Sequence, residues 1–388
     1  MKTIEKISKP YPITPNNGKH HFFGYYAISP WSKNGKYFVC LETDFQDHFP
    51  KKGEKANILL INLNENRSRV IGDTLGFNLQ QGAMLHWLPS ASDSKIIYND
   101  CEDGKVISKI LNVKTGEEKI HPMGINALAH TKDLALCLSF GRLRSCRKVC
   151  SYACVEKEGL DKHPKDDGIY TMDLKTGKTK MILSLEEVWE SNSYTKNKKL
   201  FYSPFWFNHV VFSPDDERFS FLSRFHPWLS GYRTAMWTCG VNGKELHLIT
   251  DYKNKVSHFE WISPEELMIT AKYQTNQYFH MICKDRSSQK RKIAPDILYW
   301  NGHPAKHPKL NLIATDTYVI DGNRHLYLVD LETEEVKEIA RFKNPWGIRG
   351  DYRCDPHPRW HPNGKKLSFD GLTEKDYGRQ VFCIDFEF

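Results

Sequence analysis

The stretch DGIYTMDLKTGKTKMIL, residues 167–183, contains an alternating strand, a turn and a second, shorter strand. The same arrangement returns in RHLYLVDLETEEVKEIA, residues 324–340. Weaker copies occupy four further ranges: 56–71, 106–120, 234–249 and 278–293. A pair of strands that recurs along the whole chain predicts a repeat architecture, in which each copy is one supersecondary unit.

A second kind of strand pair precedes each of these copies. It is clearest in HVVFSPDDERFSFLS (209–223), FEWISPEELMITA (259–271) and PRWHPNGKKLSFD (358–370). The remaining copies occupy four ranges: 28–42, 84–99, 127–139 and 305–316. Seven units of four short strands predict an all-β, seven-bladed β-propeller with four-stranded antiparallel blades. The alternative, an irregular pair of β-sandwiches, does not account for the seven-fold count.

The seventh unit lacks its last strand, because the sequence stops soon after its third strand, RQVFCIDF (379–386). An unpaired edge in that blade needs a partner strand. The N-terminal segment TIEKISK (3–9) alternates apolar and polar residues, so we expect it to close the ring. Residues 1–388 are accordingly expected to form a single propeller domain.

The long connections all fall on one side of the predicted propeller. In such a blade, the second-to-third and fourth-to-first connections share one face. Every long connection is of these two kinds, and five ranges qualify: 44–55, 140–167, 185–206, 225–232 and 371–378. Because loops on a rigid scaffold commonly carry function, we call this side the working face and expect the functional site there.

Composition excludes some classes of function. The formal net charge of +8 favours an acidic ligand through steering, but it lacks the dense basic stripe of nucleic-acid-binding proteins. No apolar run approaches the roughly 18 residues of a membrane span, and residues 1–26 show no signal-peptide pattern. The ten scattered cysteines therefore predict reduced thiols in a cytoplasmic protein. Nothing in the sequence indicates the oligomeric state.

Polar side chains gather where the innermost strands begin on the working face. In blade order they are Gln80 and Gln81, His209, His258, His303, then Cys354, Asp355 and His357. Imidazole, carboxylate and thiolate groups together suit a divalent transition metal such as Mn or Zn. We expect His303 and His357 as ligands, with Asp355 or Cys354 as a third. Asp355 alternates with His357 on a strand and faces the same way, whereas Cys354 faces it only across a bulge.

Three other groups have both a functional and a structural interpretation. The loop RFHPWLSGYR (224–233) offers Trp228, Tyr232 and arginines that suit an acidic sugar, or else simply packs. Gln80 and Gln81 suit sugar hydroxyls or loop backbone. The trio Cys146, Cys150 and Cys154 lacks the spacing of a common metal motif, which favours packing.

The His-containing inner strands and the segment HPRWHPNG (357–364) resemble the seven-bladed polysaccharide lyases, in particular oligogalacturonate lyase and more loosely the ulvan lyases. The resemblance implies metal-assisted cleavage of a uronic-acid-containing oligo- or polysaccharide by β-elimination. It assigns His258 as the base, Arg233 as the group that neutralises the uronate, and His303 and His357 as metal ligands. Asp355 and Tyr352 stand where the family has a histidine and a glutamine.

The remaining rim residues are then expected to contact the acidic oligosaccharide: His209, Gln80, Gln81, Trp228 and Tyr232. The competing hypothesis is a non-catalytic propeller that binds acidic glycans or a protein partner, with the histidines holding a structural metal.

Overall fold

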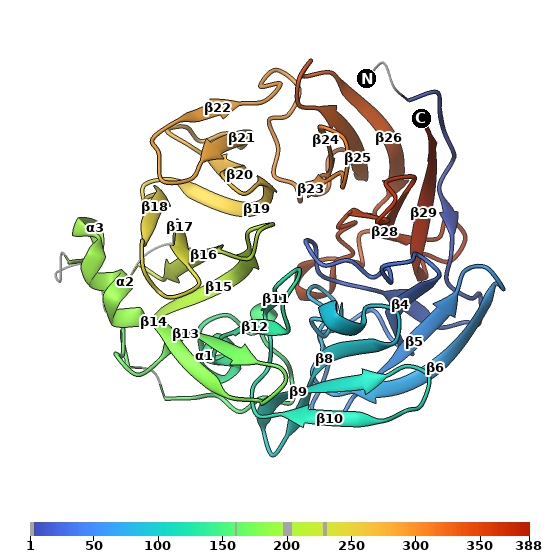
Figure 1. The fold of residues 1–388 in the computed structure, drawn as a ribbon. Helices are drawn as coiled ribbons and strands as arrows, with labels where there is room; N and C mark the ends of the chain where they lie inside the picture. Colours follow the sequence, from blue (N-terminus) through green and yellow to red (C-terminus); the bar gives the residue numbers. More distant parts are fainter. Residues whose placement is uncertain (1–3, 160, 197–203, 228–230) are drawn as a thin grey trace.

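The protein, a computed structural model that describes residues 4–159, 161–196, 204–227 and 231–388, consists of seven antiparallel sheets around a central axis (Figure 1). Six sheets have four strands each, and the seventh has five because both N-terminal strands join it. This confirms the predicted all-β, seven-bladed propeller.

The strands follow one another blade by blade from the axis outward. Blade 1 contains β3 (His20–Phe22), β4 (Tyr37–Thr43), β5 (Ala56–Asn62) and β6 (Arg67–Thr74). Blade 2 contains β7 (His86–Trp87), β8 (Lys95–Glu102), β9 (Lys105–Asn112) and β10 (Glu118–His121). Blade 3 contains β11 (Ala127–Leu128), β12 (Leu134–Cys137), β13 (Gly168–Asp173) and β14 (Thr179–Ser184). Blade 4 contains β15 (Phe205–Phe212), β16 (Arg218–Phe225), β17 (Arg233–Gly240) and β18 (His247–Thr250).

The last three blades repeat this order. Blade 5 contains β19 (Lys255–Ser263), β20 (Glu266–Lys272), β21 (Phe279–Lys284) and β22 (Lys290–Lys292). Blade 6 contains β23 (Ala305–Lys306), β24 (Leu312–Asp316), β25 (Asn323–Asp330) and β26 (Val336–Lys343). Blade 7 contains β27 (Arg359–Trp360), β28 (Lys366–Leu372) and β29 (Arg379–Glu387), together with β1 (Lys6–Ile7) and β2 (Tyr11–Pro12).

The N-terminus closes the ring, as expected from its alternating pattern. In β1, Lys6 and Ile7 pair with Glu387 and Phe386 of β29, and β2 continues along the same strand. The paired segment extends further than the predicted 3–9, since the amide of Ile13 still donates to the carbonyl of Val381 at 2.9 Å. The edge of the last blade is thereby covered, which removes a site of strand addition.

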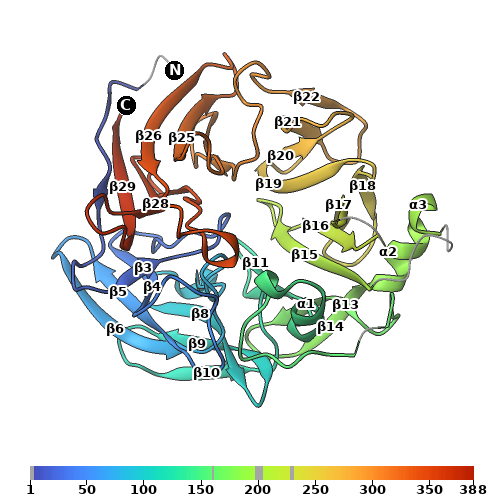
Figure 2. The same ribbon diagram turned by 180° about the vertical axis from the view of Figure 1, so that it is seen from behind.

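The described residues include six helical segments, and five of them lie in connections of the working face. They are α1 (Phe140–Cys146), α2 (Leu185–Ser191), α3 (Ser193–Lys196) and the short 3-10 turns η1 (Pro89–Ala91), η2 (Lys148–Cys150) and η4 (Gly350–Tyr352), of which only η1 belongs to the opposite face. Seen from behind, α1 lies in front of β13 and β14 (Figure 2). A capping box between Ser184 and Glu187 fixes the start of α2. No helix in the described ranges is both long and apolar enough to cross a bilayer.

Neighbouring blades interlock through histidines on the face opposite the working face. The ring of His361 in blade 7 lies over Gly35 of blade 1, and the ring of His307 in blade 6 lies over Gly364 of blade 7. Both glycines have positive φ, +71° and +80°, and a Cβ at either would collide with the imidazole. Glycine is therefore required at these turns both for backbone conformation and for blade contact.

Three inner strands share a local irregularity that turns side chains toward the axis. Met84, His209 and His357 each have positive φ, and each stands five residues before the proline of the next turn. In β15 the ladder shifts register between Asn208 and Val211, so His209 lies in a bulge. Bulges of this kind commonly redirect a side chain. Here two of the three bring an imidazole to the centre of the propeller.

Candidate functional site

The working-face end of the central channel is a recess of about 60 Å³. It is lined by residues from all seven blades: Tyr25, Tyr26, Gln80, Gln81, Arg147, Val149, Cys150, His209, Arg224, Tyr232, Ser257, His258, His303, Tyr318, Arg353 and His357. A separate cavity of about 490 Å³ occupies the other end of the channel, and Tyr25 lines both. The structure thus brings together most of the residues that the sequence placed at this rim.

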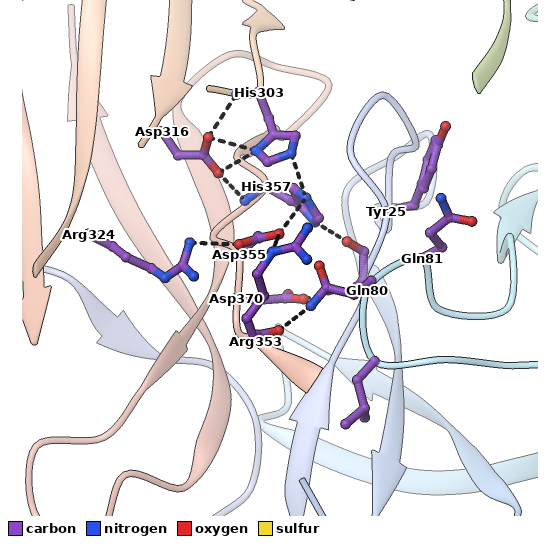
Figure 3. A network of polar contacts seen from close by, with 12 residues as sticks. Tyr25, Gln80, Gln81, His303, Asp316, Arg324, Arg353, Asp355, His357 and Asp370 are labelled. Atoms are coloured by element: carbon purple, nitrogen blue, oxygen red, sulfur yellow. Dashed lines mark hydrogen bonds and ion pairs between the residues drawn. The ribbon is translucent and has the colours of Figure 1, made fainter. Parts of the chain in front are cut away.

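His303 and His357 face each other across blades 6 and 7 (Figure 3). Asp316, the last residue of β24, accepts a hydrogen bond from Nδ1 of His303 at 2.8 Å and from the backbone N–H of His303 at 2.7 Å. Its other oxygen accepts from the backbone N–H of His357 at 2.9 Å. One buried carboxylate therefore orients both histidines.

The hydrogen bonds fix which ring nitrogens are free to bind a ligand. Nδ1 of His303 faces the Asp316 carboxylate, and Nδ1 of His357 faces the carbonyl of Gly24, so each Nδ1 carries the proton. The two Nε2 atoms then present lone pairs to each other at 3.1 Å. Burial, and next the neighbouring His303, lower the pKa of His357 well below the usual histidine value. Neutral imidazoles with Nδ1–H bound to an acceptor are the form in which histidine binds metals.

Asp355 supplies a carboxylate to the same cluster, and Oδ2 lies 4.0 Å from Nε2 of His357. The ligand atoms of His303, Asp355 and His357 all lie within 4.8 Å of one another. Arg324 donates to Asp355 at 2.6 Å and Arg353 at 2.7 Å. Despite burial, these two arginines hold the pKa of the carboxyl group far below its usual range. The donor set of two neutral imidazoles and one carboxylate fits a divalent transition metal.

Cys354, the alternative third ligand, is not part of this cluster. Its side chain is buried with Ile348 and Leu372 in a small apolar group. Burial raises the pKa of the thiol to about 11, so it is protonated at neutral pH. Successive residues point in opposite directions along extended backbone, and Asp355 rather than Cys354 therefore faces the histidines.

His258 lies beside the cluster without belonging to its hydrogen-bond network. Its ring centroid is 3.8 Å from that of His303, and its Nδ1 is buried with no hydrogen-bond partner among the described residues. Burial lowers its pKa well below 6.5, and the neighbouring His303 and His209 lower it further. His258 is therefore a neutral imidazole with an available nitrogen at the wall of the recess.

Two tyrosines that the sequence did not indicate lie among the four histidines of the recess. Tyr26 contacts the rings of four histidines at centroid distances between 5.2 and 5.9 Å: His209, His258, His303 and His357. The hydroxyl of Tyr25 lies 2.6 Å from Nδ1 of His209. Both follow Gly24, whose φ of +98° and close contact with Gly82 leave no room for a Cβ. A glycine followed by two aromatic residues is the sequence pattern that could have indicated these two tyrosines.

The predicted arginine is not at the site. Arg233 is exposed at the start of β17, where it pairs with Phe225, and it does not line the recess. Its neighbour Tyr232 points the opposite way and does line it. Arg224, Arg147 and Arg353 are the arginines of the recess. Trp228, the other aromatic residue predicted in this loop, lies outside the described residues.

The two rim glutamines both line the recess, as their position predicted. The amide nitrogen of Gln80 donates to the carbonyl of Arg353, while its Oε1 is buried without a partner in the described part of the chain. Backbone N–H groups of Gln80 and Gln81 both donate to Asn78 at 2.9 and 2.7 Å. Gln80 thus bonds loop backbone, and Gln81 remains a candidate for substrate contact.

The prediction that all cysteines are reduced is wrong for one pair. Cys101 of β8 and Cys154 form a disulfide that ties the long loop of blade 3 to blade 2. Cys146 and Cys150 are free thiols, and Cys150 lines the recess. The sequence could not reveal the pair, because 53 residues separate the two cysteines and Cys154 lies in the long connection between β12 and β13.

Solved structures with the same architecture include oligogalacturonate lyases. The enzyme from Vibrio parahaemolyticus is 12% identical, with a TM-score of 0.67 and 98% of each chain covered. An oligogalacturonate lyase in complex with manganese is 14% identical, with a TM-score of 0.70, covering 99% of this chain and 95% of that one. The β-propeller domain of the trilobed protease from Pyrococcus furiosus is 10% identical, with a TM-score of 0.55, covering 93% and 95%.

No known protein-family profile matches the sequence, and no curated protein matches it in sequence. At these identities the likeness to the solved structures establishes the fold. The fold expected from the resemblance to oligogalacturonate lyase is therefore confirmed, and the chemistry has to be argued from the site.

Proposed function

We propose that this protein is a lyase that cleaves uronic-acid-containing oligo- or polysaccharides by β-elimination. The observation that carries the proposal is the meeting of four imidazoles from four consecutive blades in one recess, with guanidinium groups beside them. A uronate must lose its weakly acidic C5 proton, while the charge that spreads onto its carboxylate must be stabilised. The recess offers a neutral base and several cationic groups for these two tasks.

His258 is the proposed base. Its Nδ1 is buried at the recess without a hydrogen-bond partner among the described residues, and its low pKa keeps it neutral over the physiological range. A neutral imidazole at the wall of the recess can accept the C5 proton while the C4–C5 double bond forms and the C4–O bond breaks, and the departing oxygen takes a proton from solvent. Ser257 and Tyr318 line the recess beside it.

His303, His357 and Asp355 would hold the divalent metal. Asp316 fixes the rings so that both Nε2 atoms face the shared position. When bound, a divalent ion would act as a Lewis acid toward the uronate carboxylate. The manganese in one similar lyase structure is consistent with this choice and is a property of that protein. The histidine and carboxylate donors are compatible with either Mn or Zn.

The neutralising cation assigned to Arg233 by resemblance must come from another residue. Arg353 bonds to Asp355 at 2.7 Å and lines the recess, so it lies next to the cluster. Because it lies beside the proposed metal site, where the uronate carboxylate would bind, Arg353 is the residue we propose in place of Arg233. Gln81, His209 and Tyr232 remain proposed substrate contacts because all three line the same recess.

The test is a direct assay for the elimination product. The purified, metal-loaded protein is incubated with a panel of acidic oligosaccharides, and formation of the conjugated unsaturated uronyl group is followed by ultraviolet absorbance. We expect product with at least one uronate-containing substrate and none after chelation of the metal. Absence of product from every member of the panel would reject the lyase.

A second candidate function is a binding platform for acidic glycans, with a structural metal. Lys148 and Asp351 form an ion pair of 3.2 Å that joins the loops of blades 3 and 7 and would help to hold such a binding surface in place. Glycan binding without any elimination product would identify this function.

A further inference from the structure

Two arginines of the recess contact the same tyrosine ring. The guanidinium carbon of Arg147, between α1 and η2, lies 4.5 Å from the ring centroid of Tyr232. That of Arg224, on β16, lies 4.8 Å from the same centroid, and Lys255 Nζ lies at 5.7 Å. Burial alone would raise the pKa of Tyr232, but the three cations outweigh it and lower the pKa. The ring is thus surrounded by positive charge.

Neither arginine has an acidic partner in the described residues, and the residues outside them include no Asp or Glu. Arg224 is only 2% exposed, and its Nε donates to Thr234 Oγ1 at 3.2 Å. Burial lowers the pKa of Arg224, and the charge of Arg147 lowers it further. Buried charges are normally paired because desolvation is costly. Two neighbouring cations without a carboxylate therefore indicate a place that an anion occupies.

The pair belongs to a different part of the recess from the metal cluster. Arg147 and Arg224 come from blades 3 and 4, whereas His303 and His357 come from blades 6 and 7, on the other side of the seven-bladed ring. Lining one recess from separate sides, they can contact different groups of one ligand.

The segment that carries Arg147 is held firmly. The side-chain amide of Asn78 donates to the carbonyls of Val149 and Ser151 at 3.2 and 3.0 Å. The disulfide between Cys101 and Cys154 ties the same loop to blade 2. A preorganised guanidinium loses little freedom when it binds an anion.

We propose that Arg147 and Arg224 form a second anion site, which takes a carboxylate or sulfate group of the saccharide. The planar forks of two guanidiniums suit both oxyanions. The proposal rests on the proposed function and deepens it: the substrate carries two acidic groups, one at the metal cluster and one at these arginines. Tyr232 contacts both guanidinium groups and so lies beside the proposed site.

The experiment measures binding by calorimetry on the full chain, with inorganic sulfate, glucuronate and glucose as separate probes. We expect sulfate and glucuronate to bind and glucose not to bind. Arg147→Gln and Arg224→Gln should each weaken binding of the preferred oxyanion by about 10- to 100-fold, the scale of a charged hydrogen bond. Arg286→Gln, which removes an exposed arginine paired with Glu245 at 3.3 Å, is the matched control and should change nothing.

The comparison of sulfate with glucuronate decides which oxyanion the site prefers. If Arg224→Gln fails to fold, the oxyanion affinity of Arg147→Gln, a substitution of a half-buried residue, tests the proposal by itself. Unchanged oxyanion affinity in Arg147→Gln would overturn the anion site, even in a protein that performs elimination. Arginine-dependent binding in a wild type that makes no unsaturated product would support the site and reject the lyase, so the two failures are distinguishable.

Discussion

The two sides of the recess differ in how their charges are satisfied. On blades 6 and 7 the buried carboxylates beside the recess have partners: Asp316 accepts a hydrogen bond from His303, and Asp355 lies between Arg324 and Arg353. On blades 3 and 4, Arg147 and Arg224 contact Tyr232, and neither has a carboxylate partner in the described chain. A side whose carboxylates already orient neutral imidazoles is prepared for a cation. A side with unpaired guanidiniums is prepared for an anion.

The largest expected effect is on the base that lies between the two sides. His258→Ala should lower the elimination rate about 100- to 10,000-fold, because a positioned base is lost. Metal content, measured as the molar ratio of metal to protein, should stay at the wild-type value, since His258 lies outside the proposed ligand set. A variant that retains near wild-type turnover would remove His258 from the mechanism.

The next effect is a difference in the free energy of unfolding between variants on the two sides of the recess. Asp355→Asn removes the partner of Arg324 and Arg353, and breaking a buried ion pair from one side costs about 3–5 kcal/mol. Chemical denaturation of the chelated protein measures this without a contribution from metal. Arg224→Gln removes a charge that has no such partner, so its unfolding free energy should fall far less than that of Asp355→Asn. Equal losses of unfolding free energy in the two variants would contradict the proposed difference between the two sides of the recess.

A smaller effect concerns the orientation of the ligands. Asp316→Asn should weaken metal binding about 10- to 100-fold, the usual scale for a hydrogen-bond partner of a metal-binding histidine. The matched control is Asp216→Asn, a buried carboxylate that bonds the backbone of His130 and Thr131 on the opposite face. Metal affinity that responds equally to both substitutions would show a general loss of fold instead.

The smallest effect is on pH dependence. The folded pKa of His258 lies well below the unperturbed value of about 6.5, so the base stays neutral as the pH falls to that value. Between pH 7.5 and 6.5 the elimination rate should therefore change less than about twofold, and it should fall only at lower pH. The free energy of unfolding should also decrease as the pH falls below about 6.5, because His258 binds a proton in the unfolded chain at a pH where it remains neutral in the folded chain. A rate profile with its midpoint at or above 6.5 would contradict the low pKa.

Part of the site was predictable because it lies at repeated positions. His209, His258, His303 and His357 all stand on or just before an inner strand, and the repeat places those strands together around the axis. Asp316 was missed, although a signal existed. Three second strands have an aspartate at or two residues before their end, and each of these aspartates accepts backbone N–H groups: Asp100, Asp316 and Asp370. An acidic residue at the end of an apolar strand could have indicated this role.

The sequence by itself determined the architecture, because strand alternation and turn chemistry are local properties that recur in every unit. It also determined that the N-terminal segment would close the ring, since one unit lacked a strand. Only the tertiary structure decided which polar residues meet. That Tyr232 rather than Arg233 lines the recess depends on which way successive residues point, and the exclusion of Cys354 depends on the same alternation. The positions of Arg147 and Tyr26 depend on an inserted loop and a bend at Gly24, whose paths are fixed by contacts with distant blades.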